Sequence, residues 1–217
     1  ILLDRVRARV GEKRFALGVQ LIEGHHDALD ISAGYARVAE AAIQVLTDAT
    51  ISEFEEIHGK IPGGALLILA LGRLGGEALT HASDLDLVFL FSGDHSAESD
   101  GKRSLGATQY YNRLTARIVT ALSVPTAAGP LYEVDTRLRP SGTQGPLAVT
   151  LESFYKYQRE SAWTWEHMAL TRARPVYGDR ADRAELEQAI RGILCKDREP
   201  EELRKAVRKM RLDIVEH

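Results

Sequence analysis

The segment of residues 83–90 constrains the fold of this chain more than any other part of its sequence. It reads Ser-Asp-Leu-Asp-Leu-Val-Phe-Leu, so that two aspartates alternate with leucines before an apolar run. Successive side chains of a β-strand point to opposite faces of the sheet, so alternate ones share a face. Asp84 and Asp86 therefore share one face of a strand. Leu85 and Leu87 share the other face, which we expect to be buried.

The aspartate pair predicts a metal site. Aspartate is disfavoured inside strands, so two of them in alternation beside an apolar run need a specific reason. Oxygen ligands fixed on a rigid element suit Mg²⁺. We therefore expect Asp84 and Asp86 to bind magnesium. The alternative is a half-exposed strand that carries two solvated acids.

A buried strand and a glycine turn precede the aspartates. Residues 65–71 form a continuous apolar run, which is typical of a buried strand, and residues 72–77 follow as Gly-Arg-Leu-Gly-Gly-Glu. Glycines let a backbone turn sharply and let phosphate oxygens approach N–H groups. The spacing matches neither a Walker A loop nor a dinucleotide fingerprint. A Gly-Gly turn alone is often an ordinary turn without a binding role. Beside the aspartates it indicates a triphosphate loop, and we expect Gly75, Gly76 and Ser83 to contact the phosphates.

A third carboxylate is expected from a strand over residues 131–138. Alternation there would place Glu133, Asp135, Arg137 and Arg139 together on one face. In isolation this pattern fits a solvated sheet edge. Beside a metal-binding strand, however, Asp135 can complete the metal site, and the two arginines can neutralise phosphate charge through their planar guanidinium groups.

The remaining patterns predict an α+β fold. Residues 1–60 read as mainly helical and residues 61–149 as a mixed α/β core. Residues 150–217 read as a truncated helical domain, in which Pro175 interrupts the pattern. Within the core we expect strands near 64–71, 84–91 and 131–138 and a helix near 105–123.

Charge and composition exclude several classes of protein. The net charge is −3 with no long basic run, which argues against a nucleic-acid partner. No apolar stretch approaches the ~20 residues that a membrane span requires, and we expect no signal peptide. The single cysteine, Cys195, excludes an internal disulfide and fits a reducing cytosol. We therefore expect a cytoplasmic chain. Because it opens without Met and closes inside a charged, helix-forming run, we also expect a fragment of a longer protein.

Several strings of the sequence resemble the family of bifunctional glutamine synthetase adenylyltransferase/adenylyl-removing enzymes. They are residues 71–77, 83–87, 132–142, 162–167 and 172–174, and upstream residues 14–18 and 34–40. The resemblance covers nearly the whole chain. It implies a DNA polymerase β-type nucleotidyltransferase core with N-terminal helices and a C-terminal helical segment. The nucleotidyltransferase domain would then cover residues 1–149, with 1–60 as a helical lead-in and 61–149 as the catalytic core. One departure is Arg73, where the family usually carries Lys.

The resemblance also implies a function. One half of such an enzyme attaches AMP from ATP to a tyrosine of glutamine synthetase, and the other half removes it by phosphorolysis. Residues 135–142 and 162–167 are similar to the C-terminal, adenylylating half. The implied partners are glutamine synthetase as substrate and, for the full-length enzyme, a PII-type nitrogen signal protein.

The expected mechanism is nucleotidyl transfer that uses two Mg²⁺ ions held by Asp84, Asp86 and Asp135. Two alternatives stay open at this point, namely the phosphorolytic half of the same enzyme and a nucleotide-sensing module without turnover. A further cluster, Trp163, Trp165, Glu166 and His167, is more typical of helix packing than of base stacking, and its role is open.

Overall fold

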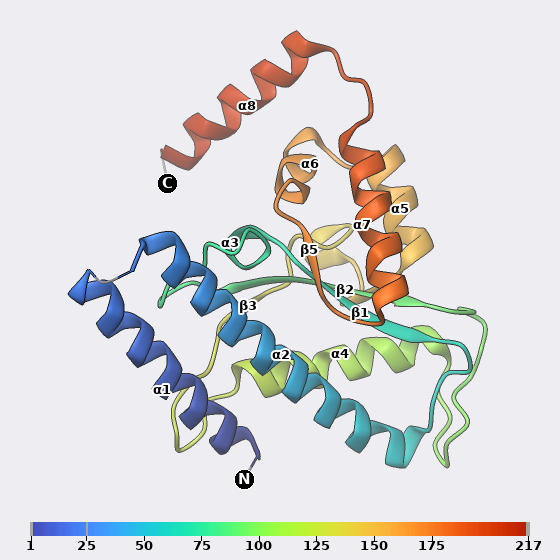
Figure 1. The fold of residues 1–217 in the computed structure, drawn as a ribbon. Helices are drawn as coiled ribbons and strands as arrows, with labels where there is room; N and C mark the ends of the chain where they lie inside the picture. Colours follow the sequence, from blue (N-terminus) through green and yellow to red (C-terminus); the bar gives the residue numbers. More distant parts are fainter. Residues whose placement is uncertain (1, 25, 216–217) are drawn as a thin grey trace.

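The computed structural model describes residues 2–24 and 26–215, and within them a mixed β-sheet lies between two layers of helices (Figure 1). The predicted ranges 1–60 and 150–217 therefore extend slightly outside the described residues. The predicted α+β class is confirmed. Among the described residues, no helix is long and apolar enough to cross a membrane.

Five strands form the sheet in the order β3-β2-β1-β5, and β4 also pairs with β2. Strand β1 is antiparallel to β2 and β5, whereas β3 and β4 are both parallel to β2. The strands are β1 (Ala65–Ala70), β2 (Leu85–Ser92), β3 (Val134–Asp135), β4 (Ala148–Thr150) and β5 (Arg174–Tyr177). The strands predicted near 64–71 and 84–91 are thus confirmed.

The strand predicted over 131–138 is only two residues long, so that prediction was wrong in extent. The chain turns directly after Asp135, because the Asp135 carboxylate accepts a hydrogen bond from the backbone N–H of Arg137 at 2.7 Å. An aspartate that binds the N–H two residues onward forms a local turn that competes with the strand. Glu133, Asp135, Arg137 and Arg139 therefore do not share one strand face.

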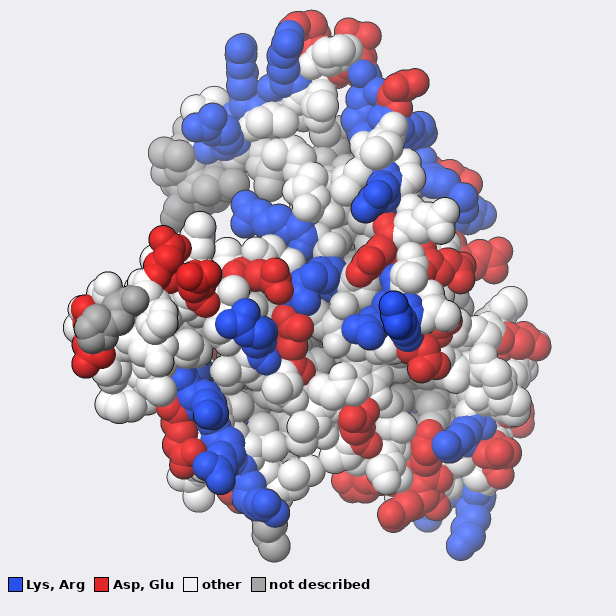
Figure 2. Space-filling model, viewed as in Figure 1, with Lys and Arg blue, Asp and Glu red and all other residues white. Residues whose placement is uncertain are grey.

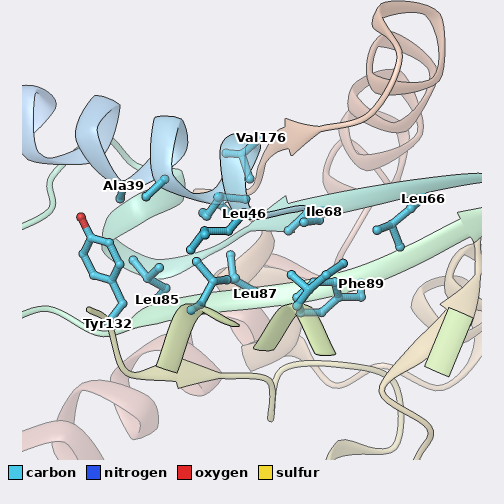
Figure 3. Packing of buried hydrophobic residues seen from close by; sticks show 14 of the residues in the cluster. Ala39, Leu46, Leu66, Ile68, Leu85, Leu87, Phe89, Tyr132 and Val176 are labelled. Carbon is cyan, nitrogen blue, oxygen red and sulfur yellow. The ribbon is translucent and has the colours of Figure 1, made fainter. Parts of the chain in front are cut away.

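Two helices cover each face of the sheet. Helices α2 (Ala28–His58) and α4 (Ala107–Ser123) pack on the face that carries Ile68, Leu87 and Phe89, as Figure 3 shows for α2. Helices α5 (Leu151–Glu160) and α7 (Arg180–Leu194) pack on the opposite face. Strands β1 and β2 are thus buried on both sides, which explains their nearly continuous apolar sequences.

The remaining elements lie around this core. Helix α1 (Leu2–Glu23) packs along α2, and α3 (Gly72–Gly75) joins β1 to the loop before β2 (Figure 1). The others are the short helix η1 (Gly142–Gln144), α6 (Thr164–Leu170) and α8 (Pro200–Val215), which contacts α6.

Strand β5 is a further difference from the sequence-based expectation, which assigned residues 150–217 to helix. It forms an edge strand, and Pro175 sits next to an irregularity in its pairing with β1. Proline, which lacks an N–H, is tolerated at such an edge. The domain boundary at residue 149 stays a prediction.

Candidate active site

Three carboxylates meet where β2 begins. Asp84, Asp86 and Asp135 each offer one oxygen atom, and these atoms all lie within 4.8 Å of one another. The parallel pairing of β2 and β3 places Asp86 directly beside Asp135. Asp84 shares the face of Asp86 because it stands two residues earlier. The structure thus brings together the three residues that the sequence predicted as metal ligands.

Burial and the repulsion between neighbouring carboxylates both affect the ionisation of the cluster. Burial raises the pKa of Asp86 to about 6, and the neighbouring charges of Asp84 and Asp135 add to the effect. The pKa of Asp135 is lowered instead, chiefly by the side-chain hydrogen bonds that it accepts from Arg137. The Arg137 guanidinium lies 2.5 Å and 2.8 Å from Asp135 Oδ2.

The donor set fits a hard divalent cation. It consists of carboxylate oxygens alone, and one of the three groups is half-buried and held in its charged form only against the repulsion of the others. A cation at this position would relieve that repulsion. A depression of about 340 Å³ opens beside the cluster and is lined by Asp84, Glu133, Val134, Asp135, Thr136 and Arg137.

The glycine turn lies against Asp86. Gly72 has a positive φ of 54°, and a Cβ atom built on it would stand 2.0 Å from Asp86 Oδ2. The backbone N–H of Leu71 also donates to the Asp86 carbonyl at 2.9 Å. At the other end of the turn, a Cβ on Gly75 would stand 2.0 Å from the Arg172 carbonyl oxygen. Both positions therefore require glycine.

The residues predicted to contact phosphate lie in and beside this turn, and their polar groups form hydrogen bonds with nearby residues. The N–H groups of Gly75 and Gly76 donate to the carbonyls of Leu71 and Gly72 at 2.8 Å and 3.3 Å. The Ser83 hydroxyl lies 2.7 Å from the Thr80 hydroxyl. Phosphate contact by these groups would need local rearrangement, and it stays a prediction.

The two predicted arginines differ in their surroundings. The Arg137 side chain is 75% exposed and stands beside the carboxylates. Arg139 is buried, and its guanidinium donates to the carbonyls of Thr136, Gly145 and Pro146. Arg139 thus holds the loop that follows β3, and the structure does not bring it to the carboxylates. Its predicted role as a phosphate contact remains untested.

Two arginines that the sequence analysis did not single out support the site. Arg14 of α1 donates to the carbonyls of His81 and Leu131, which precede Asp84 and Asp135 respectively, and its guanidinium lies 5.2 Å from the centre of the Tyr132 ring. Arg174 of β5 donates to two carbonyls of the glycine turn. Both arginines lie in strings that carry the family resemblance, but no local pattern indicates these long-range contacts.

The aromatic cluster of α6 lies partly in solvent. Trp163 and Trp165 are 70% and 45% exposed, so neither side chain is buried among the described residues, and their packing role stays a prediction. Glu166 is buried and accepts hydrogen bonds from the Trp163 N–H and the Tyr157 hydroxyl, both at 2.8 Å. His167 binds the Gln158 carbonyl at 2.8 Å. Glu166 and His167 thus make structural contacts.

Charges of both signs are interspersed on the face of the molecule drawn in Figure 2, and basic side chains form a row along α1. This face has no continuous basic groove of the kind that follows a nucleic-acid backbone.

Comparisons with known proteins agree with this geometry. The family model for glutamate-ammonia ligase adenylyltransferase matches residues 2–189. Bifunctional glutamine synthetase adenylyltransferase/adenylyl-removing enzymes are similar to the chain: that of Brucella suis is 46% identical over 97% of the chain, that of Xanthobacter autotrophicus 44% over 98%, and that of Rhizobium meliloti 43% over 97%. The chain spans 22%, 22% and 21% of these relatives, about a fifth of their length. It belongs to the glutamate-ammonia ligase adenylyltransferase family.

Proposed function

We propose that this chain is the catalytic part of an adenylylating half, which transfers AMP from ATP to a tyrosine of glutamine synthetase. One observation carries the proposal: Asp84, Asp86 and Asp135 converge within 4.8 Å beside a glycine turn that touches Asp86. The names of the relatives, which include both adenylyltransferase and adenylyl-removing activity, support the reaction class.

Each residue of the cluster has a role in this proposal. Asp84, Asp86 and Asp135 would hold two Mg²⁺ ions. When bound, these supply charge neutralisation for the triphosphate and favour the ionised form of the attacking tyrosine, whose hydroxyl otherwise titrates near ~10. Hydrogen bonds from Arg137 lower the pKa of Asp135 further below its ordinary value, which favours its charged form. Arg137 is exposed at the edge of the depression, where its guanidinium can turn from Asp135 to phosphate oxygens. Pyrophosphate is the leaving group.

The direction of the reaction rests on the strings 135–142 and 162–167, which resemble the adenylylating half. The alternative is the phosphorolytic half of the same enzyme. A nucleotide-sensing module without turnover is less well supported, because a binding module has no need for all three carboxylates. Glutamine synthetase as protein substrate and a PII-type signal protein as partner of the whole enzyme belong to the same proposal.

The decisive experiment is incubation of the chain with glutamine synthetase, Mg²⁺ and ATP labelled at the α-phosphorus. We expect label on a tyrosine of the target and a mass gain of one AMP per modified subunit. An Asp84→Asn variant should lose transfer, and Asp94→Asn, which alters an exposed loop aspartate, should keep it. Release of ADP from adenylylated target on addition of orthophosphate, without AMP gain, would instead assign the chain to the removing half.

A further inference from the structure

We infer that Arg174 is a positioning residue that anchors the glycine turn to α2 and thereby holds the Asp86 carboxylate in place. This inference rests on the proposed function, because it assigns Arg174 to the site that would bind Mg-ATP. Nothing in the sequence pattern around Arg174 indicates the role. It follows from contacts between segments that are about a hundred residues apart.

The Arg174 guanidinium connects three parts of the chain. Its Nε donates to the Gly75 carbonyl at 3.3 Å, and its Nη2 donates to the Leu74 carbonyl at 3.2 Å. The same Nη2 lies 2.5 Å from Glu40 Oε1 on α2 and 3.9 Å from Glu77 Oε1. The Arg174 and Glu40 side chains are only 28% and 26% exposed. Their interaction is therefore less screened than that of a surface pair.

The contacts on α3 reach Asp86 through a very short element. Leu74 and Gly75 form the C-terminal end of α3, and Gly72 forms its first residue. At ~1.5 Å of rise per residue these ends are about 5 Å apart, so a displacement at one end is carried to the other. The backbone of Gly72 lies against Asp86 Oδ2, where no Cβ would fit. Arg174 therefore acts on the carboxylate through α3 without touching it.

The arrangement is specific to a guanidinium. The last carbonyls of a helix lack intrahelical partners, and here the fork of Arg174 supplies donors to two of them while it also binds a carboxylate. A lysine ammonium has a single nitrogen, so it cannot stand at the positions of both Nε and Nη2. Arg174→Lys therefore keeps the charge opposite Glu40 but loses at least one of the two bonds that locate α3.

The test compares Arg174→Lys and Glu40→Gln with wild type, and Arg204→Lys serves as a matched control because Arg204 forms an exposed ion pair with Glu201 on α8. Two quantities are measured on each folded variant. One is hydrogen exchange of residues 71–77 without ligand. The other is Mg-ATP affinity by calorimetry.

We expect faster exchange in residues 71–77 and about tenfold weaker Mg-ATP binding in Arg174→Lys, the size that loss of a charge-assisted hydrogen bond produces. Glu40→Gln keeps an acceptor of the same shape, so we expect a smaller effect in the same direction. It also supplies the test if Arg174→Lys fails to fold. Arg204→Lys should match wild type in both measurements.

Three results would contradict the inference or its premise, and they are distinguishable. Unchanged exchange in residues 71–77 for both variants would show that Arg174 does not hold the turn. Faster exchange with unchanged Mg-ATP affinity would reduce Arg174 to a structural residue. If wild type itself does not bind Mg-ATP, the proposed function fails, while the exchange data still decide whether Arg174 anchors α3.

Discussion

Replacing Asp86 with asparagine should stabilise the metal-free protein while it removes the response to magnesium. Asparagine has nearly the shape of aspartate but no charge, so it removes the cost of burying a charged carboxylate and relieves the repulsion from Asp84 and Asp135. The pKa of Asp86 is raised from 3.8 to about 6. At ~1.4 kcal/mol for each pKa unit, this corresponds to an upper limit of about 3 kcal/mol. Because Asp86 is only half-buried, solvent screening reduces the expected gain to about 1–2 kcal/mol.

The sign of the pH dependence follows from the direction of the shift. The folded state binds the Asp86 proton more tightly than the unfolded state does, so the free energy of unfolding of wild type falls as pH rises between about 4 and 6. Above about pH 6 the charged Asp86 destabilises the folded state to its full extent, and below about pH 4 this destabilisation vanishes because the carboxyl is protonated in both states. Asp86→Asn should therefore exceed wild type in stability at pH 7–8, and the difference should close on acidification.

The assay is urea unfolding in EDTA at several pH values, followed by thermal unfolding with saturating Mg²⁺ at pH 7.5. Asp94→Asn is the matched control, because hydrogen bonds from Ser96 lower the pKa of that exposed aspartate, and its replacement should not stabilise the protein. Magnesium should raise the melting temperature of wild type but not that of Asp86→Asn. An Asp86→Asn variant that is no more stable than wild type at pH 8, or one that keeps the magnesium shift, would refute this reasoning.

Three further predictions concern the surroundings of the cluster. Gly72→Ala should abolish the thermal shift produced by Mg-ATP, because the added Cβ overlaps a carboxylate oxygen of Asp86, and a preserved shift would contradict the geometry. Gly11→Ala on α1 is the control: its Cβ meets nothing within 4 Å, so it should be neutral or should stabilise the protein by up to about 1 kcal/mol. Arg14→Gln should both lower the melting temperature and weaken Mg-ATP binding, as measured by differential scanning fluorimetry and calorimetry. The variant loses the contact with the Tyr132 ring and the charged donors to the Leu131 and His81 carbonyls, which lie in the segments that carry Asp135 and Asp84. Arg137→Ala should slow AMP transfer and should destabilise the protein at neutral pH, as measured by urea unfolding. The loss of stability should disappear as pH falls through the range in which Asp135 protonates, because Arg137 is the main cause of the lowered pKa of that carboxyl.

The sequence predicted those parts of the fold that local periodicity controls. Strands β1 and β2 were predictable because their side chains are buried on both faces, and α4 because its buried residues recur at helical spacing. The convergence of Asp84, Asp86 and Asp135 was also predictable, since it needs only two neighbouring strands in parallel register.

Other parts depended on competition between local and distant contacts, which the sequence pattern does not reveal. The strand over 131–138 stops early because Asp135 binds its own turn, and this alternative looks the same as continued alternation in sequence. Arg139 turned inward because three loop carbonyls needed donors. Strand β5 was missed because Pro175 reads as a helix breaker, and only the free edge of β1 gives it a place in the sheet.

The pairing of β1 with β5 affects how the protein folds while it is being synthesised. A ribosome releases residues 65–70 long before residues 174–177, so β1 waits for its second neighbour while about a hundred further residues are synthesised. Until then its outer edge carries unpaired backbone groups that invite pairing with another chain. The glycine turn also lacks the Arg174 side chain that donates to the Leu74 and Gly75 carbonyls during this interval. Nascent chains that end before residue 177 should therefore be prone to aggregation and should depend on chaperones.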